Sequence, residues 1–317
     1  MINDIMKSEW IKSRRDYGEV CPVFRKTFSC GKNVIKAKLQ ITAMGVYEAC
    51  LNGKRIGDFF LAPGWTEYDK RHQYQTYDVT ECIKNENVLY VTVGKGWYRG
   101  MLIEWRDQNI WGGVSAIIAA LNIEYDDGTI QNVFTDNTWQ TSESQIRMSE
   151  IYDGETYDAS FIPSNWEPAS ILHAAKSSLI PQEGEIVCEH GQIPVKAVIR
   201  TPNGETVFDF GQNMAGYVCF SVNARKGDII EYSHGEILHK DGNLYTKNLR
   251  SAKQHIKYIC CHAEQNYRPH FTFMGFRYIR MERMPAGMSA SDFMAVPVYS
   301  DMRRTGYYIC SNDKVNR

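Results

Sequence analysis

Short runs of β-branched and aromatic residues alternate with turn-forming residues along most of this sequence, and this rhythm constrains the fold more than any other feature. The run Val46–Leu51 is typical of a strand, and the Asn52-Gly53 pair after it strongly favours a type I′ hairpin, since both turn residues must reach positive φ. A second β-branched run, residues 88–93, ends at Gly94. Helical periodicity never persists beyond about three turns. The pattern therefore predicts an all-β protein.

The length of the chain indicates more than one domain. At 317 residues it exceeds an ordinary single domain, and 43% hydrophobic residues suffice for two buried cores. Strand patterns weaken after Trp166, and residues 181–184 are typical of a linker. We expect two antiparallel β-sandwich domains in tandem, over residues 1–184 and 185–304. The strand pattern at residues 148–159 is assigned to the first of them.

The charge balance argues against two classes of partner. The formal net charge is −1, so the chain offers no basic field for nucleic acid and no polybasic anchor for a membrane. No apolar run approaches the roughly 18 residues that a membrane-spanning helix needs. The nine cysteines are odd in number and show no C-x-x-C spacing, which indicates reduced, buried thiols. We therefore expect a cytoplasmic protein with no nucleic-acid or membrane partner.

Two sets of motifs, one in each half of the chain, carry a family resemblance. The first half contains Y-E-A-C-L-N-G-K-R-I-G-D at 47–58, L-A-P-G-W-T-E-Y at 61–68, R-H-Q-Y-Q-T-Y-D-V-T at 71–80 and G-K-G-W-Y-R-G at 94–100. The second half contains F-D-F-G-Q-N-M-A-G-Y at 208–217, H-G-E-I-L at 234–238, D-G-N-L-Y-T at 241–246 and R-P-H-F-T-F-M-G-F-R-Y at 268–278. In this order the motifs closely resemble the N-terminal region of bacterial α-L-rhamnosidases of glycoside hydrolase family 78.

The resemblance implies a jelly-roll or galactose-binding-like first sandwich and a concanavalin-like second one, followed by an (α/α)6 catalytic barrel. In relatives, a phrase matching residues 308–316 leads into the first helix of that barrel, and the acidic catalytic residues lie beyond it. Residues 305–317 are thus expected to be the start of a truncated catalytic domain, with Ser311 or Asn312 as the helix cap. The family is inverting and takes its acid and base from the barrel. We therefore assign no catalytic residue to this chain, and the missing barrel is its expected partner.

A group of aromatic residues with one arginine forms the first candidate sugar-binding site. Its members are Trp65, Tyr68, Trp97, Tyr98 and Arg99, with Trp105 and Trp111 close by in sequence. Carbohydrate modules stack aromatic faces on the apolar side of a sugar ring and bind vicinal hydroxyls with bidentate polar groups. The alternative is that Trp97 and Tyr98 cover the core of the sandwich beside Gly96.

A second candidate site lies in two motifs that also resemble the rhamnosidase N-terminal region, T-D-N-T-W at 135–139 and Y-D-G-E-T-Y-D-A at 152–159. Some members of the family carry a calcium-dependent rhamnose-binding module. Asp136, Asn137, Glu155 and Asp158 would supply hard oxygen ligands, with Asp136 and Asn137 as the candidate Ca²⁺ ligands. The motif departs from its relatives after Asp158, where they commonly continue to an arginine. The alternative is that Asp136 and Asn137 form an Asx turn ahead of Trp139.

These observations support three hypotheses from different classes. The leading one is the non-catalytic N-terminal portion of an α-L-rhamnosidase, which supports the catalytic domain and binds rhamnose-containing glycosides or polysaccharides. The second is a free-standing carbohydrate-binding protein, and the third is a structural sandwich protein without sugar affinity. No cofactor is required by the leading hypothesis, apart from the candidate Ca²⁺.

Overall fold

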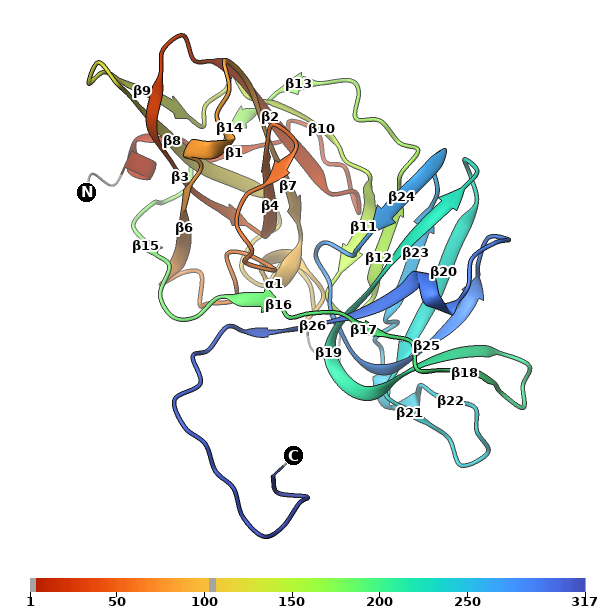
Figure 1. The fold of residues 1–317 in the computed structure, drawn as a ribbon. Coiled ribbons are helices and arrows are strands. Elements are labelled where there is room, and N and C mark those ends of the chain that lie inside the picture. The colour runs from red at the N-terminus through yellow and green to blue at the C-terminus, as the bar shows by residue number, and fades with distance from the viewer. Residues whose placement is uncertain (1–3, 103–106, 317) are drawn as a thin grey trace.

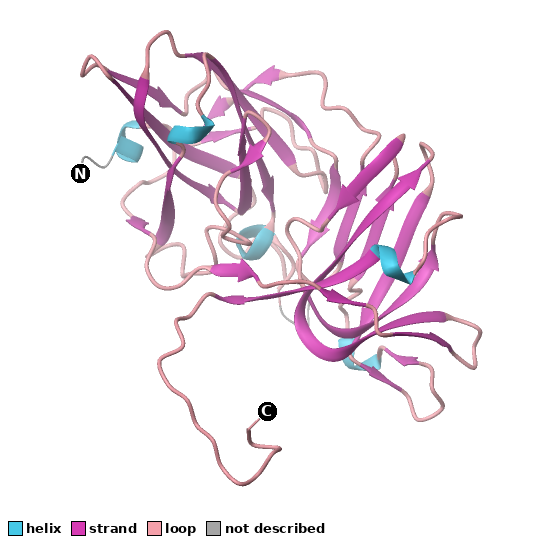
Figure 2. Cartoon of the chain, in the orientation of Figure 1, coloured by secondary structure: helices cyan, strands magenta, loops and turns pink. Residues whose placement is uncertain are grey.

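The computed structural model describes residues 4–102 and 107–316, which form two β-sandwiches side by side (Figure 1). Strands dominate, and the helical segments are short (Figure 2). These segments are the α-helix α1 (Gly96–Arg99) and the 3-10 helices η1 (Asp4–Lys7), η2 (Thr80–Cys82), η3 (Lys247–Leu249) and η4 (Ala290–Asp292). The all-β class and the tandem sandwiches predicted from the sequence are confirmed. Within the described ranges, no helix is long and apolar enough to cross a bilayer.

The first sandwich is built from two sheets. One has the order β14-β1-β8-β3-β6-β15 with β9 paired to β8, and the other has the order β13-β10-β2-β7-β4-β5. Their strands are β1 (Ile11–Lys12), β2 (Pro22–Ser29), β3 (Val34–Met44), β4 (Val46–Leu51), β5 (Lys54–Arg55), β6 (His72–Asp78), β7 (Glu86–Gly94), β8 (Ala116–Tyr125), β9 (Ile130–Phe134), β10 (Gln140–Glu143), β13 (Glu167–Pro168), β14 (Ser170–Ile171) and β15 (Leu179–Pro181).

Alternation along the strands explains how these sheets face one another. In β3, Leu39 and Ile41 are buried, whereas Lys38 and Gln40 between them are partly exposed. Because successive side chains of a strand point to opposite faces, this pattern gives the sheet one apolar face. The two apolar faces enclose a shared core that includes the fully buried Phe24.

The predicted hairpin is present at the start of the motif region. Strands β4 and β5 pair through Leu51 and Lys54, and the turn residues Asn52 and Gly53 have φ of 54° and 81°. Positive φ at both turn residues agrees with the predicted type I′ turn. The Asn52 side chain also donates to the Cys82 carbonyl at 2.8 Å, which ties the turn to the neighbouring η2.

The second sandwich is a single eleven-stranded sheet with the order β11-β12-β23-β20-β25-β19-β26-β16, and β17, β18 and β24 pair with β26 or β19. Its strands are β11 (Ile146–Glu150), β12 (Gly154–Asp158), β16 (Val187–Glu189), β17 (Ile193–Pro194), β18 (Ala197–Arg200), β19 (Thr206–Ala224), β20 (Ile229–Gly235), β23 (His255–Ile259), β24 (Ala263–Tyr267), β25 (Met274–Arg283) and β26 (Phe293–Ser300), and a separate hairpin joins β21 (Ile237–Leu238) to β22 (Leu244–Tyr245).

The long strand β19 allows one sheet to enclose a core. Its register with β25 shifts between Asp209 and Met214, and Figure 1 shows the strand bending. Such irregularities bend the strand that carries them. The bend brings Phe208 and Phe220, from the two ends of β19, onto the same buried ring of Phe293, at centroid distances of 5.4 and 5.6 Å.

The hairpin of β11 and β12 lies in the second sheet, and this placement differs from the expectation that residues 148–159 belong to the first sandwich. Strand β12 runs parallel to β23, with Gly154 opposite His255 and Asp158 opposite Ile259. Alternation reveals which side chains of a strand are buried, but it does not encode which strand lies beside it. The parallel pairing brings together β12 and β23, which lie about a hundred residues apart in the chain, and no local sequence pattern predicts it.

The two sandwiches share a buried apolar seam. Phe60 of the first sandwich and Tyr217 of the second lie with ring centroids 5.4 Å apart, and Phe271 is buried in the same cluster. Gly94, the last residue of β7, makes room for Phe271, because a Cβ added at Gly94 would lie 2.5 Å from that ring. The seam therefore depends on close approach between a backbone of one sandwich and a side chain of the other.

Charged residues surround this seam. Arg268 pairs with Glu48 of β4 at 2.5 Å and with Glu189 of β16 at 3.4 Å, and Arg55 reaches Glu189 at 3.3 Å. Burial would raise the pKa of Glu48, but the Arg268 guanidinium holds that pKa below its ordinary value. The ion pairs cross from the first sandwich to the second, so Arg268 has a partner on each side of the seam.

Glu155 fixes the loop that carries the seam residues of the second sandwich. It is fully buried on β12. Its oxygens accept hydrogen bonds from the Tyr267 hydroxyl at 2.9 Å, from the Ser149 hydroxyl at 3.2 Å and from the Phe271 backbone N–H at 3.3 Å. His270 donates twice, through its ring Nδ1 at 2.9 Å and its backbone N–H at 3.0 Å. A buried carboxylate requires such donors, and here they hold Phe271 in position.

Residues 182–186 connect β15 to β16, near the predicted linker, and the domain boundary at residue 184 stays a prediction. Beyond β26 the described residues 301–316 contain no strand or helix. The segment ends in one turn, in which the Asn316 N–H donates to the Asn312 carbonyl at 3.2 Å and the Asn312 side chain accepts from the Lys314 N–H at 3.0 Å. Asn312 thus makes a cap-like contact, while no helix follows it within the described part of the chain.

We expect Gly94→Ala to destabilise the protein by about 1–3 kcal/mol, the usual cost of overpacking a well-packed site, because Phe271 must move out of the seam. Gly31→Ala is the matched control, since a Cβ there meets nothing within 4 Å, and its effect should stay within about 0.5 kcal/mol. Urea unfolding of both variants and the wild type measures the difference. Equal stability of the two variants would show that the seam does not depend on this contact.

Candidate functional site

The motif G-K-G-W-Y-R-G forms a tight turn at the end of β7. Gly96 has a φ of 54°, and a Cβ added there would lie 2.5 Å from the Val46 side chain. Glycine is therefore required, and it starts the four-residue helix α1. This turn places Trp97 beside the seam, where it packs on the buried apolar cluster shared by the two sandwiches.

Three tryptophans, Trp97 from α1 and two from separate loops, meet at this end of the first sandwich. The rings of Trp65 and Trp97 stack with centroids 6.1 Å apart and an interplanar angle of 9°. Trp111 meets Trp65 edge-on, at 6.2 Å and 77°. We refer to Trp65, Trp97 and Trp111 as the tryptophan shelf. Trp65 is 58% exposed, so the shelf presents aromatic surface to solvent, and such a surface can stack against the apolar face of a sugar.

A buried layer of aromatic residues supports the shelf from below. The Tyr68 ring lies 5.2 Å from Tyr98 and 5.3 Å from Trp111, and its hydroxyl donates to the Gly64 carbonyl at 2.8 Å. Tyr68 and Tyr98 are both buried. Tyr98 is buried, as the core-covering alternative expects, whereas Trp97 packs on the seam cluster but stays partly exposed and belongs to the shelf as well.

His72 completes this buried layer as a neutral side chain. Burial lowers the pKa of His72 to about 4, and a 2.9 Å hydrogen bond between Nε2 and the Ala43 carbonyl opposes that shift only in part. The neutral ring therefore donates through Nε2. Its centroid lies 5.3 Å from both Tyr68 and Trp10, so His72 is a packing residue of the layer.

Arg99 faces a different part of the surface. Its Nη1 donates to the Ser115 hydroxyl at 2.9 Å, and its side chain lines a hollow of about 170 Å³ together with Tyr17. No member of the tryptophan shelf lines that hollow. The structure therefore brings together the aromatic members of the first predicted site, but it does not bring Arg99 into them. Trp105 lies outside the described residues.

Asp136 and Asn137 lie in the turn between β9 and β10. The Asp136 carboxylate accepts from the Thr138 backbone N–H at 2.9 Å and from the Thr138 hydroxyl, which is the pattern of an Asx turn. Lys26 lies 3.9 Å from the same carboxylate. Trp139 follows the turn and is buried, with its ring N–H donating to the Phe134 carbonyl at 3.0 Å. The geometry thus contains the predicted turn, and the calcium role of Asp136 and Asn137 stays a prediction.

Glu155 and Asp158 do not lie with Asp136. Both belong to β12 in the second sheet, whereas Asp136 belongs to the first sandwich. Glu155 is buried and accepts the hydrogen bonds described above, which leaves it no exposed surface for a sugar. Asp158 accepts from the Ser160 N–H at 2.9 Å and from the Ser160 hydroxyl at 2.7 Å. The two motifs of the second predicted site therefore serve separate local structures.

A hollow beside the seam was not predicted from the sequence. It has a volume of about 890 Å³ and lies beside the seam, where its lining includes Arg268, Glu189 and Tyr217. Arg268 is paired with Glu48 and Glu189, so the hollow offers no unpaired cation. Arg268, the charged residue of the R-P-H-F motif between apolar strands, was the sequence signal for this hollow. Its partners Glu48 and Glu189 come from distant segments, so the signal did not show where the hollow would form.

Comparison with known proteins places both halves in one family. Residues 32–198 match the alpha-L-rhamnosidase N-terminal domain, and residues 199–299 match the bacterial alpha-L-rhamnosidase concanavalin-like domain. An alpha-L-rhamnosidase of Streptomyces avermitilis is 36% identical over 82% of this chain and 26% of its own length. One from Formosa agariphila is 34% identical over 92% of this chain and 33% of its own length. The chain thus spans about a third or less of these relatives.

Solved structures agree with this match. The alpha-L-rhamnosidase of Aspergillus terreus superposes on the whole chain with a TM-score of 0.94 at 34% identity, and the match covers 39% of that protein. The Streptomyces avermitilis enzyme, solved in complex with L-rhamnose, gives a TM-score of 0.83 at 34% identity over 89% of this chain and 29% of its own. The chain therefore belongs to the bacterial α-L-rhamnosidase family, of which it holds the N-terminal and concanavalin-like domains.

Proposed function

We propose that this chain is the non-catalytic β-sandwich portion of an α-L-rhamnosidase that hydrolyses terminal α-L-rhamnose with inversion, and that the tryptophan shelf binds rhamnose-containing glycosides or polysaccharides. The observation that carries the sugar-binding role is the stacked pair of Trp65 and Trp97, with Trp65 58% exposed. Rhamnose is a 6-deoxy sugar, so its methyl group and ring hydrogens offer an apolar face. Aromatic rings favour such a face, since contact removes apolar surface from water.

The supporting role rests on two properties of the chain. First, the relatives are about three to four times as long as the matched region, so in them most of the protein lies outside these two domains. Second, the described residues 301–316 expose apolar side chains, with Tyr307 80%, Tyr308 73% and Ile309 85% exposed. A contiguous apolar stretch of this kind is typical of a segment that packs on another domain. We propose the catalytic barrel as that domain.

We propose a reducing, cytoplasmic location as well. All nine cysteines are free thiols, and four of them are buried. Buried unpaired thiols are typical of proteins from reducing compartments.

The chain by itself should not hydrolyse an aryl α-L-rhamnoside, because an inverting reaction needs an acid and a base that the family takes from its barrel. Release of the aryl group from purified protein measures this directly. Protein from a host lacking its own rhamnosidase serves as the control. Turnover that survives purification from that host would contradict the assignment of a non-catalytic role.

Trp65→Ala should weaken rhamnose binding by roughly 3- to 10-fold, since aromatic contacts contribute about 0.5–1.5 kcal/mol each beyond area burial. Trp166→Ala is the matched control, because Trp166 is also partly exposed but packs under Arg25, away from the shelf. Calorimetric titration with L-rhamnose compares the variants. An affinity that Trp65→Ala leaves unchanged would remove the shelf from sugar binding.

Asp136→Ala tests the calcium prediction separately. If the Asx turn is its whole role, the variant should lose about 1 kcal/mol of stability and keep its rhamnose affinity, with or without a chelator. If Asp136 and Asn137 bind Ca²⁺, both the mutation and the chelator should abolish ion and sugar binding, since a hard cation cannot lose a charged oxygen ligand and keep its site. Titrations of rhamnose with calcium and with a chelator decide between the two.

A further inference from the structure

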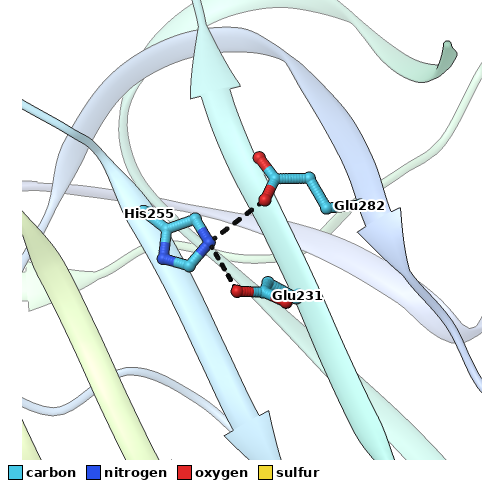
Figure 3. Close-up of side chains that lie close together, drawn as sticks. All are labelled: Glu231, His255 and Glu282. Carbon is cyan, nitrogen blue, oxygen red and sulfur yellow. Dashed lines mark ion pairs between the residues drawn. The ribbon is translucent and has the colours of Figure 1, made fainter.

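A histidine and two glutamates converge on the outer face of the second sandwich, away from the tryptophan shelf. Glu231 comes from β20, His255 from β23 and Glu282 from β25, which are neighbours in the sheet order β23-β20-β25 (Figure 3). The three ligand atoms lie within 4.8 Å of one another. None of the three side chains is fully buried, with exposures of 17%, 26% and 31%, so the cluster is open to an ion from solvent.

A β-bulge brings Glu282 into this cluster. Glu231 is opposite Arg283, but the next residue, Tyr232, is opposite Met281, so Glu282 is the extra residue of β25. Bulges redirect side chains and are over-represented beside functional sites. Here Glu282 and Arg283 both lie against Glu231, and the His255 ring approaches from the strand on the other side.

The two distances from His255 to the glutamates are compatible with a shared metal ion. The Nε2 atom of His255 lies 3.2 Å from Oε1 of Glu231 and 3.3 Å from Oε2 of Glu282. A charge-assisted hydrogen bond would be about 2.7–2.9 Å. Zn²⁺ bound to histidine nitrogen and carboxylate oxygen at about 2.0–2.2 Å in tetrahedral geometry would separate these atoms by about 3.3–3.5 Å.

The remaining oxygen of each glutamate is held by a residue outside the cluster. Oε2 of Glu231 faces the Arg283 guanidinium at 3.2 Å, and Oε1 of Glu282 accepts from the Ser233 hydroxyl at 2.6 Å and faces Arg280 at 3.2 Å. Each carboxylate thus contacts Arg283, or Ser233 and Arg280, with one oxygen, and its other oxygen faces His255. Metal-binding carboxylates are typically oriented in this way by outer hydrogen bonds.

Arg280 and Arg283 lie close to the cluster, and their positive charges oppose the binding of a cation there. Arg280 is shared with Glu205 at 3.2 Å, so its charge is not directed at the cluster alone. Both arginines also contact the carboxylate oxygens other than the two that face His255, namely Oε1 of Glu282 and Oε2 of Glu231.

We propose that Glu231, His255 and Glu282 bind one divalent transition-metal ion, with Zn²⁺ as the best match and water as the fourth ligand. One imidazole nitrogen with two carboxylate oxygens is a donor set for zinc and its neighbours, whereas calcium prefers oxygen ligands alone. The ion would cross-link three adjacent strands of the concanavalin-like domain and so stabilise the folded state.

Zinc titration of the metal-stripped chain tests the proposal, with accessible thiols alkylated beforehand so that cysteines do not compete. We expect one Zn²⁺ per chain for the wild type, loss of that binding in His255→Gln and Glu282→Gln, and a 10- to 100-fold weaker affinity in Ser233→Ala. His239→Gln is the matched control, because His239 also pairs with a carboxylate, Asp241 at 3.2 Å, but on an exposed loop. It should bind zinc like the wild type.

Circular dichroism of each variant confirms that it is folded, and X-ray absorption of the zinc-loaded wild type supplies a readout that needs no variant. The spectrum should contain nitrogen and oxygen scatterers without sulfur. Absence of zinc binding by the wild type, sulfur in the spectrum, or equal binding by the wild type and a folded His255→Gln or Glu282→Gln variant would overturn the proposal. The last two results would mean that zinc binds elsewhere.

Discussion

The contact of Phe271 with Gly94 is the constraint on which the arrangement of this molecule depends. A side chain of the second sandwich occupies the space that a side chain at Gly94 would need in the first. Phe271 is held there because its own N–H and the neighbouring His270 bind the buried Glu155. Fixing Phe271 in turn fixes Arg268 on the same loop, which pairs with Glu48 across the seam. Packing and charge thus act on one loop, and each requires the other.

The contacts of this loop join the two sandwiches through both packing and charge. A buried ion pair contributes little net stability when compared with apolar residues, but breaking it by removal of one partner is costly. The Arg268 pairs are therefore weak evidence for net stability, although removal of Glu48 would leave the Arg268 charge with only Glu189 as its partner. Trp97 packs on the same apolar cluster, so the position of the tryptophan shelf is set by the seam. A sugar that stacked on the shelf as proposed would find its rings already ordered, which would lower the entropic cost of binding.

The parts of this structure that the sequence predicts are those that local chemistry determines. Asn52-Gly53 specifies its hairpin because both residues tolerate positive φ, and Asp136 specifies an Asx turn through a hydrogen bond two residues along the chain. Trp65 and Trp97 are grouped from the sequence only by residue type, and their stacking comes from α1 and a separate loop that meet in the fold. The sequence does not reveal which distant segments lie side by side. The pairing of β12 with β23 and the ion pair of Arg268 with Glu48 both join segments that are far apart in the chain. Such pairings depend on tertiary packing, which periodicity does not record.

Glu155 and Glu282 show why residue type alone misjudges a site. As sequence, Glu155 beside an aspartate-rich motif suggests a ligand, yet its place on a buried strand and its many donors make it a structural anchor. Glu282 has no motif around it, and it reaches His255 only because a bulge on β25 inserts one residue. A shift of one residue reverses the face to which a strand side chain points, so the bulge decides whether this carboxylate meets the cluster or not. In a β-sandwich, strand register therefore decides which groups a carboxylate can contact, and the residues beside it in sequence matter less.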